Sequence, residues 1–295
     1  MHEFGEQFVN GLVDGSSYAA LGLSLVLILR ITRIGNFAQG SQALVAVYLV
    51  WSLLSTGMPL IVAIILSTIA SFMLGAILYI VIVRPVDRDQ ESPYGTVILT
   101  LGLLSVLQYG AQAIWGADPL NFPALFGAET VRVFGVATTR QAVGTIGVLI
   151  VLCILLYLFV EKSKLGIAFR AVAENRLAAA SVGVPILWIL ALGWGIAAAI
   201  GAICGSLVAP TLILQPQMMS TVLVYAFSGA VLGGPTSLAG AVAGCMLLGL
   251  LDDLVAAYVP AIGGSYSLLV AFVVIVAVLL VRPQGLFGHR EAVAR

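Results

Sequence analysis

Charged side chains are scarce in this chain. Its 295 residues include 13 Lys and Arg and 13 Asp and Glu, or 9% charged residues, whereas a soluble domain carries about 25%. The formal net charge is zero, and without a basic surplus we expect no nucleic-acid partner. The three cysteines, Cys153, Cys204 and Cys245, are scattered through apolar runs. We interpret them as small packing residues and not as a disulfide framework.

The residues that most catalytic sites need are also missing. The two histidines, His2 and His289, lie near the ends of the chain, which excludes a histidine-based triad or zinc site within the long apolar runs between them. The loop G-x-x-x-x-G-K-[ST] is absent, because neither Lys162 nor Lys164 follows a glycine. We therefore expect a chain that is not an enzyme, has no metal site and binds no cofactor of its own.

Most of the chain is apolar. Hydrophobic residues make up 61% of the chain, and the mean hydropathy is +1.13. A helix needs about 20 apolar residues to cross the hydrocarbon core, and runs of that length repeat from Phe8 to Leu286. The sequence predicts an all-α fold, a polytopic transmembrane helix bundle of about eight to nine membrane segments in a single domain, residues 1–295. The expected segments are 8–29, 36–57, 60–83, 94–114, 141–160, 186–209, 221–234, 237–258 and 265–281.

The seventh segment, 221–234, is short for a crossing. It is compatible with a half-helix, a re-entrant segment or a span buried inside the bundle, and we favour nine true crossings. The positive-inside rule then gives the orientation. With the N-terminus outside and the C-terminus in the cytoplasm, only Arg132 and Arg140 of the 13 basic residues lie outside.

Small residues recur four positions apart in several segments. Such ridges let helix backbones approach closely in lipid. We interpret them as packing within the bundle, although a ridge that serves a partner subunit remains an alternative. The ridges are Gly193, Ala197, Gly201 and Gly205; Gly229 and Gly233; Gly240 and Gly244; and Gly11, Gly15 and Ala19.

Neutral amides open the second segment. Asn36, Gln39 and Gln42 lie among Gly35, Gly40 and Ser41, and amides in lipid must be hydrogen-bonded. Irregular backbone at this depth is tolerated only where it is buried in protein or lines a cavity. We consider Asn36, Gln39 and Gln42 candidates for a substrate path, with a subunit interface or interhelical hydrogen bonding alone as alternatives. A neutral path suits a neutral or zwitterionic solute better than an ion.

Three carboxylates, Asp14, Asp252 and Asp253, lie near the expected outer ends of their helices. Solvation of a helix end is one interpretation, and a role at the outer mouth is the other. Neither provides the charged relay at depth that a proton-coupled carrier needs.

The loop 161–185 is expected on the cytoplasmic side. Leu165, Phe169 and Val172 follow the spacing i, i+4, i+7, which gives one apolar helical face, and Gly183 and Pro185 end the helix. A partner protein can bind such a helix in a groove on its own surface. The alternative is a helix that lies on the membrane surface.

Four stretches together resemble a known family. They are Leu165 to Asn175 with Ala179, Ala180, Gly183 and Val184; Asn10 to Leu12 with Gly15 to Leu23; Ile34 to Gly40, which is similar to an Asn-Phe-Ala-His-Gly signature with Gln39 in place of His; and Leu280 to Gly288, which contains Arg-Pro-Gln-Gly-Leu-Phe-Gly. They resemble the inner-membrane permease subunits of branched-chain amino-acid ABC importers, the LivH-like family, essentially from end to end.

The resemblance implies a pore-forming permease in a bacterial inner membrane. Its implied partners are a homologous second permease, two cytoplasmic ATPase subunits that bind the ATP, an extracytoplasmic solute-binding protein and membrane lipid. It implies alternating access driven by the ATPases, and import of branched-chain or related hydrophobic amino acids. Urea or short amides are the alternative solutes, and a secondary carrier is a more distant alternative. The residues that the resemblance assigns to the ATPase-coupling loop are Gly166, Arg170, Ala171, Glu174 and Asn175.

Overall fold

The computed structural model describes residues 2–32, 35–87, 93–133, 136–258, 267–282 and 284–287. Helices dominate this part of the chain. In order, the elements are α1 (His2–Thr32), α2 (Gln39–Ser55), α3 (Leu60–Leu78), the π-helical turn η1 (Tyr79–Val83), α4 (Arg84–Asp87), α5 (Pro93–Trp115), β1 (Thr130–Val133), β2 (Val136–Thr139), α6 (Arg140–Tyr157), the π-helical turn η2 (Leu158–Lys162), α7 (Lys164–Glu174), α8 (Arg176–Ser181), α9 (Ile186–Leu212), α10 (Met218–Gly233), α11 (Leu238–Tyr258) and α12 (Ser267–Val281).

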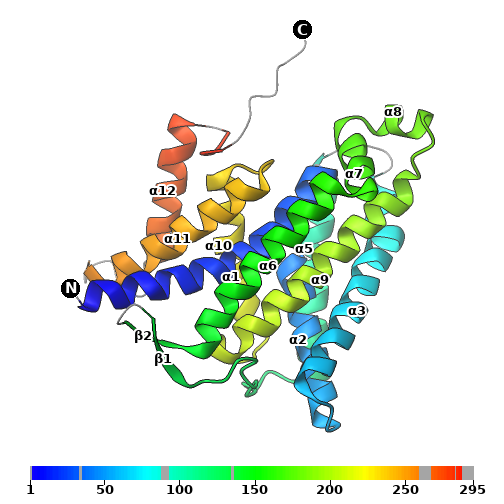
Figure 1. Ribbon diagram of the computed structural model, residues 1–295. Coiled ribbons are helices and arrows are strands. Elements are labelled where there is room, and N and C mark those ends of the chain that lie inside the picture. The colour runs from blue at the N-terminus through cyan, green and yellow to red at the C-terminus, as the bar shows by residue number, and fades with distance from the viewer. Residues whose placement is uncertain are drawn as a thin grey trace.

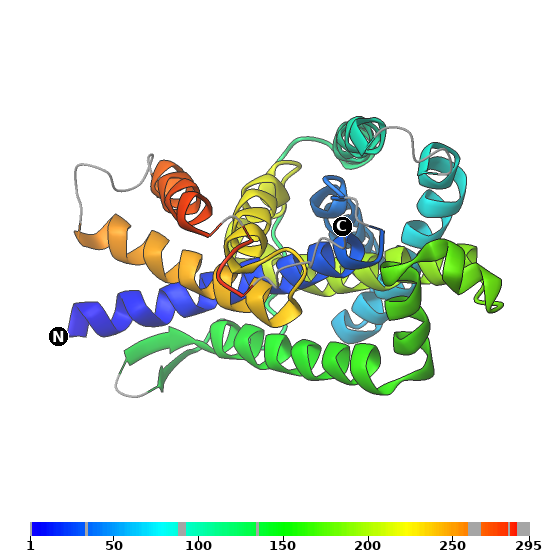
Figure 2. The ribbon, with the colours of Figure 1, turned by 90° about the horizontal axis from the view of Figure 1, so that it is seen from above.

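Two long helices occupy the centre of the bundle. Helix α1 packs along α11 and also contacts α9 and α10, while α9 contacts α3 and α2. Seen from above, α5 and α6 lie on opposite outer sides, with α1, α9 and α2 between them (Figure 2). The short helices α7 and α8 lie together at one end of the bundle, and the strands β1 and β2 lie at the other (Figure 1).

Nine apolar helices coincide with the nine segments expected from the sequence. Within the described residues, six of them are long and apolar enough to cross a membrane; α2, α10 and α12 are shorter, with 17, 16 and 15 residues. The polytopic helical class is confirmed, whereas the count of eight to nine crossings and the sidedness of the termini stay predictions. The six long helices span Phe4–Thr32, Leu60–Val86, Gly95–Trp115, Arg140–Lys162, Ile186–Leu212 and Leu238–Tyr258.

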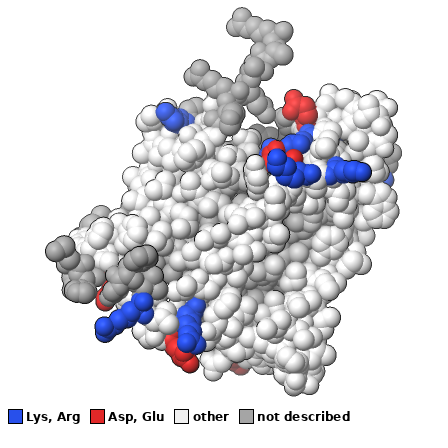
Figure 3. Space-filling view, viewed as in Figure 1, with Lys and Arg blue, Asp and Glu red and all other residues white. Residues whose placement is uncertain are grey.

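The outer helices present apolar side chains to their surroundings. Ile61 and Val81 on α3 and η1 are 71% and 64% exposed, and Ile98 on α5 is 69% exposed. On the face shown in Figure 3, Lys, Arg, Asp and Glu gather at the two ends of the molecule and leave an uncharged belt between them. An apolar belt of this kind is stable in lipid and would aggregate in water.

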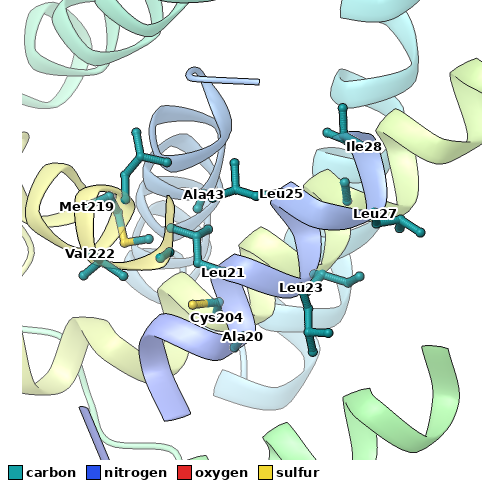
Figure 4. Packing of buried hydrophobic residues seen from close by; sticks show 14 of the residues in the cluster. Ala20, Leu21, Leu23, Leu25, Leu27, Ile28, Ala43, Cys204, Met219 and Val222 are labelled. Carbon is teal, nitrogen blue, oxygen red and sulfur yellow. The ribbon is translucent and has the colours of Figure 1, made fainter. Parts of the chain in front are cut away.

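The core forms where α1 meets α10, α2 and α9. Leu21 of α1 is fully buried and lies beside Met219 of α10 and Cys204 of α9 (Figure 4). Cys204 and Cys245 are both free and buried, and Cys153 is partly buried, as expected for packing residues.

The small-residue ridges pack against one another inside the chain. A methyl group added at Gly244 of α11 would overlap the carbonyl oxygen of Gly229 of α10 and approach the nitrogen of Gly233 to 2.7 Å. Gly15 of α1 faces the backbone of Met246 in the same way, at 2.8 Å. These ridges therefore hold helices of one chain together, as the first interpretation expected.

Two features depart from the expectation. The loop between α5 and α6 contains the antiparallel pair β1–β2, which the apolar pattern did not indicate because strands of four residues carry little periodicity. The expected cytoplasmic helix is divided into α7 and α8 at Asn175. The Asn175 side chain accepts a hydrogen bond from the backbone nitrogen of Ala178 over 3.0 Å, so it caps the second helix.

Candidate functional site

The amides predicted from the sequence meet at the start of α2. Residues 35–38 are not helical, and Asn36, Gln39 and Gln42 are fully buried. The Asn36 side chain accepts a hydrogen bond from the backbone nitrogen of Ala38 and donates one to Oε1 of Gln39, both over 3.1 Å. The irregular, buried backbone that the glycines indicated is therefore present.

Gln39 fastens this segment to α9. Its Nε2 donates a hydrogen bond to the carbonyl oxygen of Ala197 over 2.7 Å. Gly201, one turn further along α9, leaves room for this amide, because a methyl group there would lie 2.9 Å from Nε2. Ala197 is close to the middle of α9, which spans Ile186–Leu212. The polar cluster thus lies at mid-depth in the bundle, between apolar layers.

Gln42 differs from the other two amides. Neither its Nε2 nor its Oε1 has a hydrogen-bond partner among the described residues, although the side chain is fully buried. Leaving a buried amide unsatisfied costs about 1–3 kcal/mol. A residue that brings this cost into a packed helix is a candidate for a contact that forms in another state of the protein.

Helix α10 and the α1–α2 connection close the cluster on another side. Phe37 stacks on Phe227 of α10 with ring centroids 5.0 Å apart, and the Cα of Gly40 faces Leu223 and the carbonyl of Met219 at 3.2 Å from an added methyl group. The walls beside the amides are therefore aromatic and aliphatic.

Hydroxyl groups that the sequence analysis did not single out also join the helices around the cluster. Ser67 of α3 donates to the carbonyl of Ala46 over 2.6 Å, and Ser71 donates to the carbonyl of Ala198 over 2.9 Å. Both serines are buried at spacing i, i+4. That spacing within an apolar run was the available signal.

The residues that the resemblance assigns to the ATPase-coupling loop have different surroundings. Phe169 and Val172 are buried, whereas Leu165 is 45% exposed, so the inward face of α7 includes Gly166 in place of Leu165. A methyl group on Gly166 would overlap the carbonyls of Phe159 and Val160 in η2. Gly166 thus acts here by allowing the turn between η2 and α7.

The other residues of this loop lie nearer the surface. Arg170 forms an ion pair with Glu161 of η2, Ala171 is partly buried, and Glu174 and Asn175 are exposed. Nearby, Ile167, Leu177 and Val182 are 59%, 82% and 79% exposed. This end of the bundle therefore presents an acidic side chain next to apolar ones.

Helices α7 and α8 are connected to the polar cluster by two routes. Arg176 of α8 donates a hydrogen bond from Nη2 to the carbonyl oxygen of Thr32, the last residue of α1, over 3.0 Å, and the polar segment begins at Gly35. The chain also continues from α8 into α9, whose Ala197 carbonyl accepts the hydrogen bond from Gln39 of α2. Gly193 of α9 faces Phe169 of α7, since an added methyl group would lie 3.1 Å from its ring. A movement of α7 and α8 would therefore reach both sides of the cluster.

The three aspartates are near neighbours on α1 and α11. Asp14 is exposed, and Asp252 and Asp253 are partly buried. The hydroxyl of Tyr225 donates to Oδ1 of Asp252 over 3.0 Å, and Tyr225 stacks on Tyr18 with centroids 4.7 Å apart. In the described part of the chain, no group of three or more His, Cys, Asp or Glu is placed to hold a metal ion.

The C-terminal motif closes the α10–α11 hairpin. The backbone nitrogens of Leu286 and Phe287 donate to the carbonyls of Leu232 and Gly233, both over 2.9 Å. Gly285 has φ +78°, and a methyl group there would lie 2.6 Å from the nitrogen of Gly234. The structural role of this motif explains why a glycine is needed within it.

These features are those of a polytopic membrane protein with a buried polar cluster. The chain belongs to the family described as branched-chain amino acid transport system / permease component, whose model matches residues 7–279. It is a multi-pass inner-membrane transport subunit, as the resemblance implied.

Individual proteins match over nearly the full length. The chain is 28% identical to the high-affinity branched-chain amino acid transport system permease protein LivH of Salmonella typhimurium, covering 98% of this chain and 96% of that protein. It is 27% identical to the permease protein BraD of Pseudomonas aeruginosa, with 99% and 98% covered. Among solved structures, PsaBC from Streptococcus pneumoniae in complex with Fab matches with a TM-score of 0.49 and 14% identity over 96% of this chain and 93% of that chain.

Proposed function

We propose that this chain is the pore-forming permease subunit of an ATP-binding-cassette importer for branched-chain or related hydrophobic amino acids. The full-length relatives named for branched-chain amino acid transport support the substrate class. The observation that carries the proposal is the polar cluster at mid-depth, where Asn36, Gln39 and Gln42 lie beside Phe37 and Phe227. Amides suit a zwitterionic backbone, and the apolar wall suits a branched side chain.

The start of α2 adds a favourable field for the carboxylate of an amino acid. The first backbone N–H groups of a helix carry a partial positive charge, and α2 begins at Gln39 without a side-chain cap. Discontinuous helices whose N-termini face an anionic group are a recurrent device of transporter sites. Gln42, in the first turn of α2, would gain in the loaded state the hydrogen bonds that it lacks here.

The proposed partners fit the two ends of the bundle. One ATPase subunit would bind α7 and α8 of this chain, where Glu174 and the exposed side chains of Ile167 and Leu177 lie. The solute-binding protein would dock at the opposite end. There the loop after α5 and the loop after α9 are joined by reciprocal backbone hydrogen bonds between Leu120 and Leu214, over 2.9 and 3.1 Å, and so form one surface. A second, homologous permease would complete the path.

These contacts support alternating access. ATP-driven closure of the ATPase pair would move α7 and α8, and the movement would pass through the Arg176–Thr32 hydrogen bond to α1 and through the chain to α9. Because the Gln39–Ala197 hydrogen bond joins α2 to α9, a shift of α9 against α2 would open or close the cluster. We expect no ATP site in this chain, because the ATPase subunits supply it.

Gln42 gives the sharpest test. In a structural role alone, Gln42→Leu would remove an unsatisfied amide and leave transport intact. We expect instead that the assembled importer carrying Gln42→Leu melts at a higher temperature while leucine uptake into proteoliposomes falls at least about tenfold, equivalent to about 1.4 kcal/mol. Gln141→Leu is the contrast, because the Gln141 amide is paired with the carbonyl of Leu207 and the nitrogen of Phe126 and its loss should lower stability. Unchanged uptake with Gln42→Leu would remove Gln42 from the path.

A further inference from the structure

A cavity lies away from the polar cluster. It has a volume of about 430 Å³, is partly open, and is bounded by α1, by α6 with η2, and by the start of α11. Leu23 of α1 contributes to its wall and points away from Leu21, which faces α10 (Figure 4). The volume is in the range of about 300–1,000 Å³ that small-molecule sites occupy.

The lining of this cavity has an aliphatic part and a polar part. Most of the wall is aliphatic, with polar groups at the end nearest α7. The aliphatic residues are Leu23, Leu156, Val160, Leu238 and Val242, and the polar ones are Arg30, Glu161, Thr236 and Ser237. A ligand that fills this space needs an apolar part next to a polar head.

The charges at the polar end do not cancel. Glu161 is paired with Arg170, whereas Arg30 forms no hydrogen bond or ion pair with any residue that the structure describes. One positive charge therefore remains at the mouth of an apolar cavity. A cation held between membrane helices without a counter-charge is costly, so an anion bound from outside would stabilise it.

The position of the cavity indicates where the anion comes from. Next to it, Ile150 and Ile154 on the outer face of α6 are 54% and 53% exposed, so the cavity borders an apolar outer surface of the kind that is stable in lipid. Tyr157, another lining residue, is 58% exposed and suits the headgroup level. Basic pockets between transmembrane helices hold anionic headgroups in other membrane proteins.

We propose that this cavity binds an anionic phospholipid, with its phosphate on Arg30 and its acyl chain along Leu23, Leu156 and Val242. Ser237 is an additional polar neighbour, although its hydroxyl already accepts a hydrogen bond from the backbone nitrogen of Gly240 over 3.0 Å. The site is distinct from the amide cluster, and its occupancy does not depend on the solute that the importer carries.

The cavity is also adjacent to α7. Glu161 lines the cavity and holds Arg170 of α7 in the same ion pair. A phosphate on Arg30 would place a second negative charge near that pair. The lipid composition of the membrane would thus be sensed at the helix that we propose as the ATPase contact.

Cys153 provides a direct readout, because it lines the cavity and is partly buried while Cys204 and Cys245 are both 0% exposed. The assembled importer would be placed in nanodiscs of phosphatidylcholine alone or of equal parts phosphatidylcholine and phosphatidylglycerol. Modification of Cys153 by N-ethylmaleimide, an uncharged reagent, would be followed by mass spectrometry of this chain. We expect modification to be about fivefold slower with phosphatidylglycerol, the factor that about 1 kcal/mol per basic residue gives.

Matched variants distinguish an effect of the Arg30 charge from an effect on folding. Arg30→Gln should abolish the difference between the two bilayers, Arg30→Lys should retain most of it, and Arg84→Gln, which changes a basic residue outside the cavity, should leave it intact. Equal modification in the two bilayers of the unaltered protein would overturn the proposal. Protection by inorganic phosphate or glycerol phosphate in phosphatidylcholine nanodiscs would overturn the lipid assignment and identify a site for a soluble anion.

Discussion

The side-chain nitrogen of Gln39 and the carbonyl oxygen of Ala197 are 2.7 Å apart, which joins the first turn of α2 to the middle of α9. This hydrogen bond has consequences beyond stability. It lies at the depth where a transporter must open and close its path, and α9 leads from there to the end of the bundle that holds α7 and α8 (Figure 1). If α2 and α9 move against each other during transport, the Gln39–Ala197 hydrogen bond is a contact that can control this movement.

Replacing Gln39 therefore tests the path and the fold separately. Gln39→Leu removes the hydrogen bond to Ala197 and should lower stability by about 1–2 kcal/mol, the size of interhelical hydrogen bonds in membranes, and lower uptake more strongly. Gln39→His keeps a ring N–H donor and has the residue that the family signature carries, so it should insert and transport. Uptake in proteoliposomes and thermal melting are the measurements. Equal uptake by both variants would show that the amide does not act in transport.

The ATPase contact is testable at Glu174. This side chain is exposed and forms no ion pair in the described part of the chain, so Glu174→Ala should change stability by less than about 0.5 kcal/mol. We expect solute-stimulated ATP hydrolysis by the assembled importer to fall severalfold. Glu6→Ala, an exposed acidic position in α1 outside the two docking loops, is the control and should leave hydrolysis unchanged. Full stimulation with Glu174→Ala would contradict this assignment of the loop.

The interlock between α10 and α11 predicts a contrast between two glycines. Gly244→Ala places a methyl group against the backbone of α10 and should cost about 1–3 kcal/mol. Gly147, in the middle of α6, has no neighbouring atom within 4 Å of an added methyl group. Gly147→Ala should therefore be neutral or stabilise by about 0.5–1 kcal/mol. Melting temperatures of the two purified variants check this, and equal values would show that the ridges do not interlock.

Asp253 predicts a gain in stability. Its Oδ2 is buried without a hydrogen-bond partner among the described residues, and Asp252 is adjacent in sequence. Asp253→Asn removes one charge from a like-charged group and should raise the melting temperature, because an unpaired buried charge is costly. Under the helix-end interpretation leucine uptake stays unchanged. A large fall in uptake with a folded variant would favour a role at the outer mouth.

Most of the helical architecture was predictable because membrane helices are determined by local composition. The segments expected at 186–209 and 237–258 correspond closely to α9 and α11. The glycine ridges indicated close helix packing, although the sequence did not show which helices pack together. Asn36 and Gln39 were indicated by a simple physical conflict, since amides have to be satisfied in an apolar run.

Features that depend on tertiary contacts were not accessible from the sequence. The depth of Gln39 follows from its docking on Ala197, 158 residues further along the chain. The role of Gly166 follows from its contact with η2, and the division of the coupling helix depends on whether Asn175 caps a new helix or continues the old one.

The central claim is import of a branched-chain amino acid. The most direct measurement is uptake of radiolabelled leucine, with urea and a short amide as comparisons, in cells that have lost this gene and in cells complemented with it. We predict that leucine uptake is lost and returns on complementation, while uptake of urea and the amide is unaffected. Normal leucine uptake in cells without the gene, with loss of urea or amide uptake, would contradict the proposed substrate.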